Sequence, residues 1–239
     1  MIEFSFVIPV YNEAENLALL YDELQNLIRQ IKKPCEIIWI DDGSIDEGLN
    51  IIKEFVKKET HSRYMAFEKN CGQSAAMYAG FQTAKGRHVI TMDSDRQNNP
   101  MDILDMLPYL TEYDMVTGWR KNRHDTRWKK FSSRFANSVR NRLSRETIKD
   151  TGCSLKVMKS EYLKNIKMYK GLHRFLPTLM KMEGARVVEV PVSHRPRVKG
   201  VSKYGTWDRA ISGLRDLLVV RWMQDRKISY QIKEMSDGP

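Results

Sequence analysis

Residues 91–97 read TMDSDRQ, following the strand-like run RHVI at 87–90 and preceding the turn-forming residues NNP at 98–100. Asp93 and Asp95 stand one residue apart where the predicted strand ends, so the turn can bring their carboxylates together. With the side-chain oxygen of Gln97 they form a set of hard oxygen ligands that suits Mg²⁺ or Mn²⁺ and leaves coordination positions open for a diphosphate. Solvated loops also contain Asp-x-Asp pairs, so the interpretation depends on the rest of the chain.

Apolar runs alternate with segments of helical periodicity on the amino-terminal side of this stretch. Strands are predicted at 4–10, 35–40, 64–67 and 89–92. Helices are predicted between them at about 15–31, 46–58 and 74–83. The order β-α-β-α-β-α-β predicts an α/β fold with a mainly parallel sheet and helices on both faces.

Polar motifs follow three of these strands. They are YNE at 11–13, DDG at 41–43 and DSD at 93–95. Because parallel strands release their carboxyl ends at one edge of a sheet, we expect the three motifs to converge there, where ligands of such folds bind. This convergence favours a binding site over three unrelated polar loops.

The remainder of the chain continues the pattern without an internal repeat or a linker. We expect a helix from 100 to about 110, a strand at 113–118, a helix at about 127–142, a short strand at 155–158, a helix near 172–183 and a strand at 186–192. We therefore predict one domain over 1–230, which ends in an amphipathic helix at 206–230, and a disordered tail at 231–239.

The composition is that of a folded protein. The 239 residues are 41% hydrophobic, their mean hydropathy is −0.53, and no apolar run reaches the roughly 18 residues that span a bilayer. The start of the sequence lacks the features of a signal peptide, so we expect a cytoplasmic protein. Cys35, Cys71 and Cys153 have no metal-type spacing, and their odd number fits reduced thiols.

Positive charge is concentrated in one segment. The net charge is +10, and residues 119–149 contain eleven basic residues but only two acidic ones, Asp125 and Glu146. This charge favours a polyanionic partner: nucleic acid, an anionic membrane face or a phosphorylated substrate. Trp128, Phe131 and Phe135 lie among the charges, but no recognised nucleic-acid-binding motif is present, so we expect no nucleic-acid partner.

The ordered set of motifs resembles family 2 glycosyltransferases of the GT-A fold. The motifs are VIPVYNE at 7–13, IDDGS at 40–44 and DSD at 93–95. GWR at 118–120, DTGC at 150–153 and RVKGVSKYG at 197–205 resemble the branch that uses dolichyl or polyprenyl phosphate. The resemblance covers about residues 4–220 and implies a GT-A, Rossmann-like domain.

The resemblance also implies a role for each matching residue. It assigns the base and ribose of a nucleotide sugar to Pro9, Tyr11, Glu13, Ile40 and Asp42. It assigns the metal ion and the diphosphate to Asp93, Asp95 and Gln97, with Ser94 between the two acids. Carboxylates can accept hydrogen bonds from a base N–H or from ribose hydroxyls, which suits Glu13 and Asp42.

Basic residues match the positions that meet donor or acceptor phosphates, namely Arg120, Arg197 and Lys203. The planar guanidinium of arginine fits phosphate oxygens, and lysine adds a compact charge. Asp150 matches an acidic position that acts as a base or orients the acceptor. A phosphate acceptor is already anionic at neutral pH, so positioning matters more than base catalysis. Asp95, Asp150 and Arg120 are the expected catalytic residues.

The implied function is inverting, metal-dependent transfer of a sugar from a UDP- or GDP-sugar to a polyprenyl or dolichyl phosphate. UDP is slightly preferred, and the sugar stays open. One alternative is a transferase of the same fold with a soluble saccharide or protein acceptor. Two others are a nucleic-acid-binding protein that uses the basic segment and a non-catalytic relative.

A lipid-phosphate acceptor requires contact with a membrane surface. The basic segment 119–149 and the basic, tryptophan-containing helix at 206–230 can provide it, which implies a peripheral protein on the cytoplasmic face. The alternative is that this helix packs on its own domain or on a second copy in a homo-oligomer.

Overall fold

The computed structural model describes residues 1–120, 146–196, 206–228 and 233–234. Seven strands in these residues form one sheet in the order β3-β2-β1-β4-β6-β5-β7. The strands are β1 (Phe4–Val10), β2 (Cys35–Asp41), β3 (Ser62–Ala66), β4 (His88–Thr91), β5 (Met115–Arg120), β6 (Lys156–Lys159) and β7 (Val187–Val192). All neighbouring pairs are parallel except those of β6, which runs antiparallel to β4 and β5. The predicted mainly parallel sheet is confirmed.

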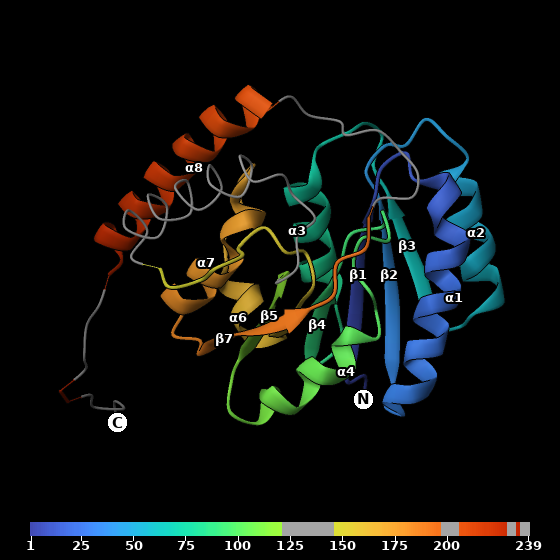
Figure 1. Ribbon diagram of the computed structural model, residues 1–239, viewed down its shortest axis with the longest axis horizontal. Coiled ribbons are helices and arrows are strands. Elements are labelled where there is room, and N and C mark those ends of the chain that lie inside the picture. Colours follow the sequence, from blue (N-terminus) through green and yellow to red (C-terminus); the bar gives the residue numbers. More distant parts are fainter. Residues whose placement is uncertain (121–145, 197–205, 229–232, 235–239) are drawn as a thin grey trace, which may run out of the picture.

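Helices cover both faces of the sheet (Figure 1). The α-helices are α1 (Ala14–Ile31), α2 (Gly48–Lys58), α3 (Gln73–Thr83), α4 (Asp102–Met106), α6 (Ser160–Asn165), α7 (Leu176–Met182) and α8 (Thr206–Arg226). Two 3₁₀ helices, η1 (Leu107–Thr111) and η2 (Leu172–Phe175), adjoin α4 and α7. Figure 1 shows α1 and α2 on one side of the sheet and α3, α6 and α7 on the other.

Two apolar clusters hold these layers together. On one face, the fully buried stripe of α1, which includes Leu17, Leu20 and Leu24, packs against the inward side chains of β1 and β2. On the other face, α3, α6, α7 and η2 cover the sheet. Gly80 lets α3 approach β1 closely, because a Cβ atom there would collide with Val7. Burying each large aliphatic side chain stabilises the fold by about 1.5–3 kcal/mol.

Several helices and strands differ in their bounds from the predicted ones, and one predicted helix consists of two. The predicted helix at 100–110 is the short helix α4 followed by η1, whose second residue, Pro108, has no N–H to donate. β3 and β5 are each displaced by about two residues from the predicted 64–67 and 113–118. The sequence reasoning did not include α6, which begins directly after β6. The predicted helix at 127–142 lies outside the described residues.

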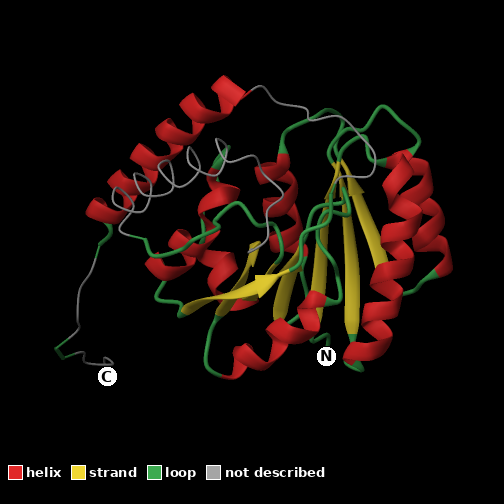
Figure 2. Cartoon of the chain, in the orientation of Figure 1, coloured by secondary structure: helices red, strands yellow, loops and turns green. Residues whose placement is uncertain are grey.

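The strand directions bring the polar motifs to one edge. β1, β2 and β4 are parallel and end at the same edge, where the following loops gather in Figure 2. β5 also ends there, at Arg120, and the antiparallel β6 begins there, at Lys156. Segments 11–13, 42–44, 93–97 and 150–155 therefore lie at one edge of the sheet, as predicted from the topology.

Candidate functional site

Asp93 and Asp95 lie in the turn that follows β4. Oδ1 of Asp93 accepts a hydrogen bond from Nε2 of Gln73 at 2.6 Å, and the backbone N–H of Asp93 donates to Oγ of Ser154 at 3.2 Å. Oδ1 of Asp95 accepts the backbone N–H of Gln97 at 3.1 Å. The turn is therefore held by α3 on one side and by the segment before β6 on the other.

The charges around Asp93 suit a divalent cation. Burial, and next the carboxylate of Asp95, raise the pKa of Asp93 to about 6, although Ser154, Lys156 and Arg120 act in the opposite direction. A buried carboxylate beside a second carboxylate forms a hard oxygen donor set whose charge a cation would offset. Among the described residues, no group of three or more His, Cys, Asp or Glu side chains is arranged to hold a metal ion. The chemistry of Asp93 and Asp95 nevertheless fits a divalent cation, and the ligand role of Gln97 stays a prediction.

A buried lysine lies beside this acidic pair. Lys156, at the start of β6, is only 2% exposed, and its amino group donates to the carbonyl of Cys153. Burial lowers the pKa of Lys156, while the thiol of Cys153 and the carboxylates of Asp93 and Asp150 oppose the shift. The register aligns Lys156 with Thr91 on β4 and Thr117 on β5, so this lysine lies in the sheet next to the candidate site.

Arg120 and Asp150 form a two-point ion pair. Nε of Arg120 donates to Oδ2 of Asp150 at 2.7 Å, and Nη2 donates to Oδ1 at 2.9 Å. Burial alone would lower the pKa of Arg120, but the carboxylate of Asp150 raises it above its ordinary value. Glu189 on β7 accepts the backbone N–H groups of Lys149 and Asp150, which anchors the loop that carries Asp150.

Asp42 organises a neighbouring loop. Its carboxylate accepts the backbone N–H groups of Cys71 and Gly72, at 2.7 and 2.9 Å, and the side-chain amide of Asn70 at 3.0 Å. Burial raises the pKa of Asp42, and those backbone hydrogen bonds act against the shift. The predicted contact of Asp42 with a nucleotide stays a prediction, because the structure shows this carboxylate binding residues 70–72.

Asp41, which sequence reasoning did not single out, has an oxygen available. Its Oδ2 accepts the N–H of Ser44, whereas its Oδ1 is buried without a hydrogen-bond partner among the described residues. A ligand N–H or hydroxyl group would satisfy that oxygen. The sequence of two adjacent aspartates does not indicate which of them keeps a carboxylate oxygen without a hydrogen bond.

The YNE motif joins the ends of β1 and β2. Asn12 has a positive φ of 51°, its N–H donates to Oγ of Ser44, and its side chain accepts the N–H of Ile45. Glu13 is 7% exposed and accepts a hydrogen bond from Asn16 at 2.6 Å. These contacts shape the corner in which Tyr11 and Glu13 were predicted to bind the base and ribose.

The other predicted residues occupy different surroundings. Pro9 and Ile40 face each other in the β1–β2 register, and the side chain of Ile40 is fully buried in the apolar cluster under α3. Ser94 is buried in the turn between the two acids. Arg197, Lys203 and residues 121–145 of the basic segment lie outside the described residues.

A half-buried histidine in η2 extends the hydrogen bonds of the site. Nδ1 of His173 lies 2.7 Å from Oγ of Ser74, and that same oxygen accepts the N–H of Gly171. Burial, and next the charges of Arg174 and Lys156, lower the pKa of His173 to about 3. His173 is thus neutral at physiological pH. Ser74 follows Gln73, which contacts Asp93. The start of α3 therefore links η2 to the turn that carries Asp93 and Asp95.

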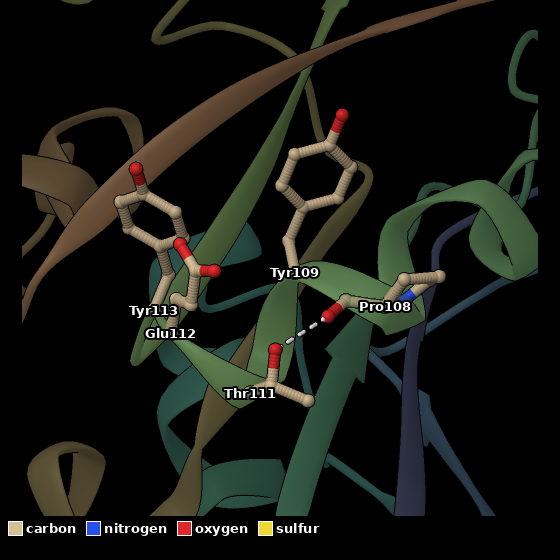
Figure 3. Close-up of a pocket in the computed structure, with 5 residues that line it drawn as sticks. All are labelled: Pro108, Tyr109, Thr111, Glu112 and Tyr113. Atoms are coloured by element: carbon tan, nitrogen blue, oxygen red, sulfur yellow. Dashed lines mark hydrogen bonds between the residues drawn. The ribbon is translucent and has the colours of Figure 1, made fainter.

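A surface hollow lies elsewhere on the molecule. It has a volume of about 270 Å³ and is lined by Pro108, Tyr109, Thr111, Glu112 and Tyr113 (Figure 3). These residues belong to η1 and the turn before β5, at the opposite end of that strand from Arg120. None of the predicted site residues lines this hollow. In the described part of the chain, every helix is too short or too polar to cross a membrane.

The fold and the site define a GT-A-type glycosyltransferase domain. The chain belongs to glycosyl transferase family 2, whose model matches residues 5–167. The family resemblance inferred from the motifs is therefore confirmed.

Two curated relatives are similar over most of the chain. Dodecaprenyl-phosphate galacturonate synthase of Rhizobium johnstonii is 36% identical over 95% of this chain and 68% of its own length. Undecaprenyl-phosphate 4-deoxy-4-formamido-L-arabinose transferase of Pectobacterium carotovorum is 36% identical over 90% of this chain and 66% of its own length. The chain thus spans about two thirds of these relatives.

Solved structures share the fold at low sequence identity. Mannosyl-3-phosphoglycerate synthase from Rubrobacter xylanophilus matches with a TM-score of 0.68 and 16% identity, over 100% of this chain and 79% of that one. Glucosyl-3-phosphoglycerate synthase from Mycobacterium tuberculosis, solved with Mn²⁺ and uridine-diphosphate-glucose, matches with a TM-score of 0.67 and 15% identity, over 92% of this chain and 79% of that one.

Proposed function

We propose that this protein transfers a sugar from a nucleotide diphosphate to a polyprenyl phosphate, with inversion at the sugar carbon and with Mg²⁺ or Mn²⁺. The observation that carries the proposal is the acidic pair Asp93 and Asp95 on the same sheet edge as the Arg120–Asp150 ion pair. The named polyprenyl-phosphate relatives support the acceptor class, and the Mn²⁺ complex of a structural neighbour supports the metal.

The acidic residues of the site would bind the metal ion, and the basic residues would contact phosphate groups. Asp93, Asp95 and Gln97 would hold the cation, which supplies Lewis-acid stabilisation of the leaving diphosphate when bound. Arg120, oriented by Asp150, would present N–H groups to phosphate oxygens. The acceptor phosphate is an anionic nucleophile already, so these residues would accelerate transfer mainly by orientation and charge neutralisation.

Calorimetric titration tests the donor site. UDP and GDP are titrated with and without Mn²⁺ into wild type and Asp95→Ala. We expect metal-dependent binding of one nucleotide that the variant loses, which also identifies the base. If neither nucleotide binds with metal present, the proposal is wrong, and salt-dependent oligonucleotide binding by the basic segment becomes the next measurement.

Product analysis then separates acceptor classes. The purified protein is given sugar nucleotides that carry the base identified by calorimetry, together with undecaprenyl phosphate in detergent, with soluble saccharides or with a protein acceptor. Formation of a lipid-linked sugar supports the polyprenyl-phosphate acceptor. Transfer to a soluble saccharide or protein alone would favour the second candidate function, which the low-identity structural neighbours leave open.

We also propose that α8 contacts an anionic membrane surface. Leu214, Leu218 and Trp222 recur at four-residue spacing and are 51%, 55% and 63% exposed, whereas Leu217 and Val220 are buried against the domain. Arg215 and Arg226 are exposed on the same helix. An outward apolar stripe with basic neighbours suits anionic headgroups and the adjacent acyl region. The predicted peripheral location on the cytoplasmic face depends on this contact.

Vesicle sedimentation tests the membrane contact. Wild type and a Leu218→Asp variant are mixed with phosphatidylglycerol-containing vesicles and with phosphatidylcholine vesicles. We expect binding to the anionic vesicles, reduced by salt and by the substitution. Absence of binding, together with a concentration-dependent dimer in sedimentation velocity that Leu218→Asp abolishes, would assign the stripe to a homo-oligomer instead.

A further inference from the structure

One carboxylate on α1 holds two arginines, Arg96 and Arg195, that lie far apart in the sequence. Oε1 of Glu23 accepts hydrogen bonds from Nη2 of Arg96 and from Nη1 of Arg195, both at 2.8 Å. The side chains of Arg96, Glu23 and Arg195 are 18%, 25% and 36% exposed. A carboxylate shared between two guanidinium groups in a half-buried position offsets their mutual repulsion.

Arg96 is the residue between Asp95 and Gln97, and its backbone is strained. Its φ is +60°, in the left-handed region that residues other than glycine, asparagine and aspartate rarely adopt. Such a conformation persists only when surrounding contacts maintain it. Among the described residues, the side chain of Arg96 is held by its hydrogen bond to Glu23, and the N–H of Gln97 spans Arg96 by donating to Asp95.

Arg195 fastens the next part of the same turn. Its backbone N–H donates to the carbonyl of Gln97 at 2.9 Å, and its Nη2 donates to Oδ1 of Asn99 at 2.7 Å. Through Arg96 and Arg195 together, Glu23 is therefore connected to both sides of Gln97. These contacts do not reach the reacting groups, so any effect of Glu23 on the reaction would act through the turn.

We propose that Glu23 is a positioning residue that keeps residues 95–97 in the conformation that presents Asp95 and Gln97 to a metal ion. The proposal rests on the proposed function in that it treats these two residues as metal ligands. Outer partners of metal ligands typically change metal affinity by about 10- to 100-fold when removed.

The first experiment measures Mn²⁺ binding and backbone exchange in Glu23→Ala. Electron paramagnetic resonance of Mn²⁺ in the presence of UDP should show about tenfold weaker binding. Hydrogen exchange without metal should be faster at the amide of Gln97, which donates to Asp95 in the native turn. Asp22→Ala is the matched control, because Asp22 is the exposed neighbour on the same helix and should change neither measurement.

The second experiment separates backbone conformation from lost charge. Arg96→Gly and Arg96→Ala are each combined with Glu23→Ala. Both remove the stranded guanidinium, but only glycine adopts φ +60° without steric cost. We expect Arg96→Gly to restore Mn²⁺ binding and slow exchange in the double variant, and Arg96→Ala to fail.

The outcomes are distinguishable from those of the proposed function. Equal rescue by Arg96→Gly and Arg96→Ala would overturn the positioning role in favour of simple charge repulsion. Unchanged exchange and unchanged Mn²⁺ binding in Glu23→Ala would overturn the proposal altogether. If wild type itself binds no Mn²⁺ with UDP or with GDP, the proposed function fails, and the exchange of Gln97 still decides whether Glu23 holds the turn.

Discussion

Arg120 holds Asp150 through both oxygens of the carboxylate, at 2.7 and 2.9 Å. A carboxylate in this arrangement has its charge matched by a rigid guanidinium fork, which makes it a poor proton acceptor and a good anchor. The pair therefore favours Asp150 as the residue that orients Arg120 toward phosphate. This role differs from both roles that the resemblance implied, a base and a group that orients the acceptor directly.

Asp150→Asn should lower kcat for sugar transfer by about 10- to 100-fold without removing the acidic limb of the pH–rate profile. The amide keeps one acceptor for Arg120 but loses the charge that fixes the guanidinium. Pre-steady-state transfer rates between pH 5.5 and 8 check this. Loss of the acidic limb would instead assign Asp150 as a general base.

Asp42→Ala should lower the free energy of unfolding by about 2 kcal/mol, because it strands the N–H groups of Cys71 and Gly72. Urea denaturation measures the change. Glu54→Ala is the control, since Glu54 pairs with Lys57 on the exposed face of α2 and should have no measurable effect. Equal effects of the two substitutions would show that Asp42 contributes little to the loop.

Stability should fall on acidification partly because of His173. Its pKa in the folded state is about 3, against 6.5 when unfolded, so the folded state binds fewer protons between these values. The unfolded state therefore gains a proton below about pH 6.5, whereas the folded state does not until about pH 3. As the pH falls between these values, the free energy of unfolding decreases by at most about 1.4 kcal/mol per pH unit. Urea denaturation of wild type and His173→Gln at pH 5 and pH 7 checks this. A pH-independent difference between them would contradict it.

Gly171→Ala should destabilise the protein by about 1–3 kcal/mol, because the new methyl group would collide with the carboxylate of Asp216 on α8. Gly184→Ala is a matched control: Gly184 also has a positive φ, but nothing lies within 4 Å of the added carbon. Urea denaturation gives the loss of unfolding free energy for each substitution, and the difference between Gly171→Ala and Gly184→Ala measures the packing of α8 on η2. Adding Asp216→Ala to Gly171→Ala should remove this difference and nothing more. Equal losses for the two glycine substitutions would mean that α8 moves aside without cost.

The amino-terminal half of the fold was predictable because each signal there is local. β1, β2 and β4 are buried, mainly apolar strands, and the helices that follow β1 and β2 carry apolar residues at helical spacing, as in α1. The direction of β6 was not predictable, since four residues, Lys156 to Lys159, carry no information about whether their neighbours run parallel. Pro108 marked the end of α4, but the sequence reasoning did not use it.

The candidate site was predictable to the extent that it consists of strand ends. Glu13, Asp42 and Asp93 were placed at one edge by the parallel order alone, whereas Arg120 entered only through the family resemblance. The partners of the turn after β4 were not predictable, because Gln73 and Ser154 reach Asp93, and Glu23 reaches Arg96, across 20 to 73 positions of sequence. Only the strand order and the helix crossings determine such contacts, and no local pattern encodes them.

The antiparallel strand β6 has a consequence for how this domain can diversify. Since β5 ends and β6 begins at the ligand edge, the connection over 121–155 leaves and re-enters the sheet at the same place. Insertions or replacements before Asp150 in that connection can keep the strand order, and they leave in place Ser154, which contacts the turn after β4. Evolution, or a designer, can therefore vary the residues between β5 and Asp150 while the contacts among the ends of β1, β2 and β4 are inherited.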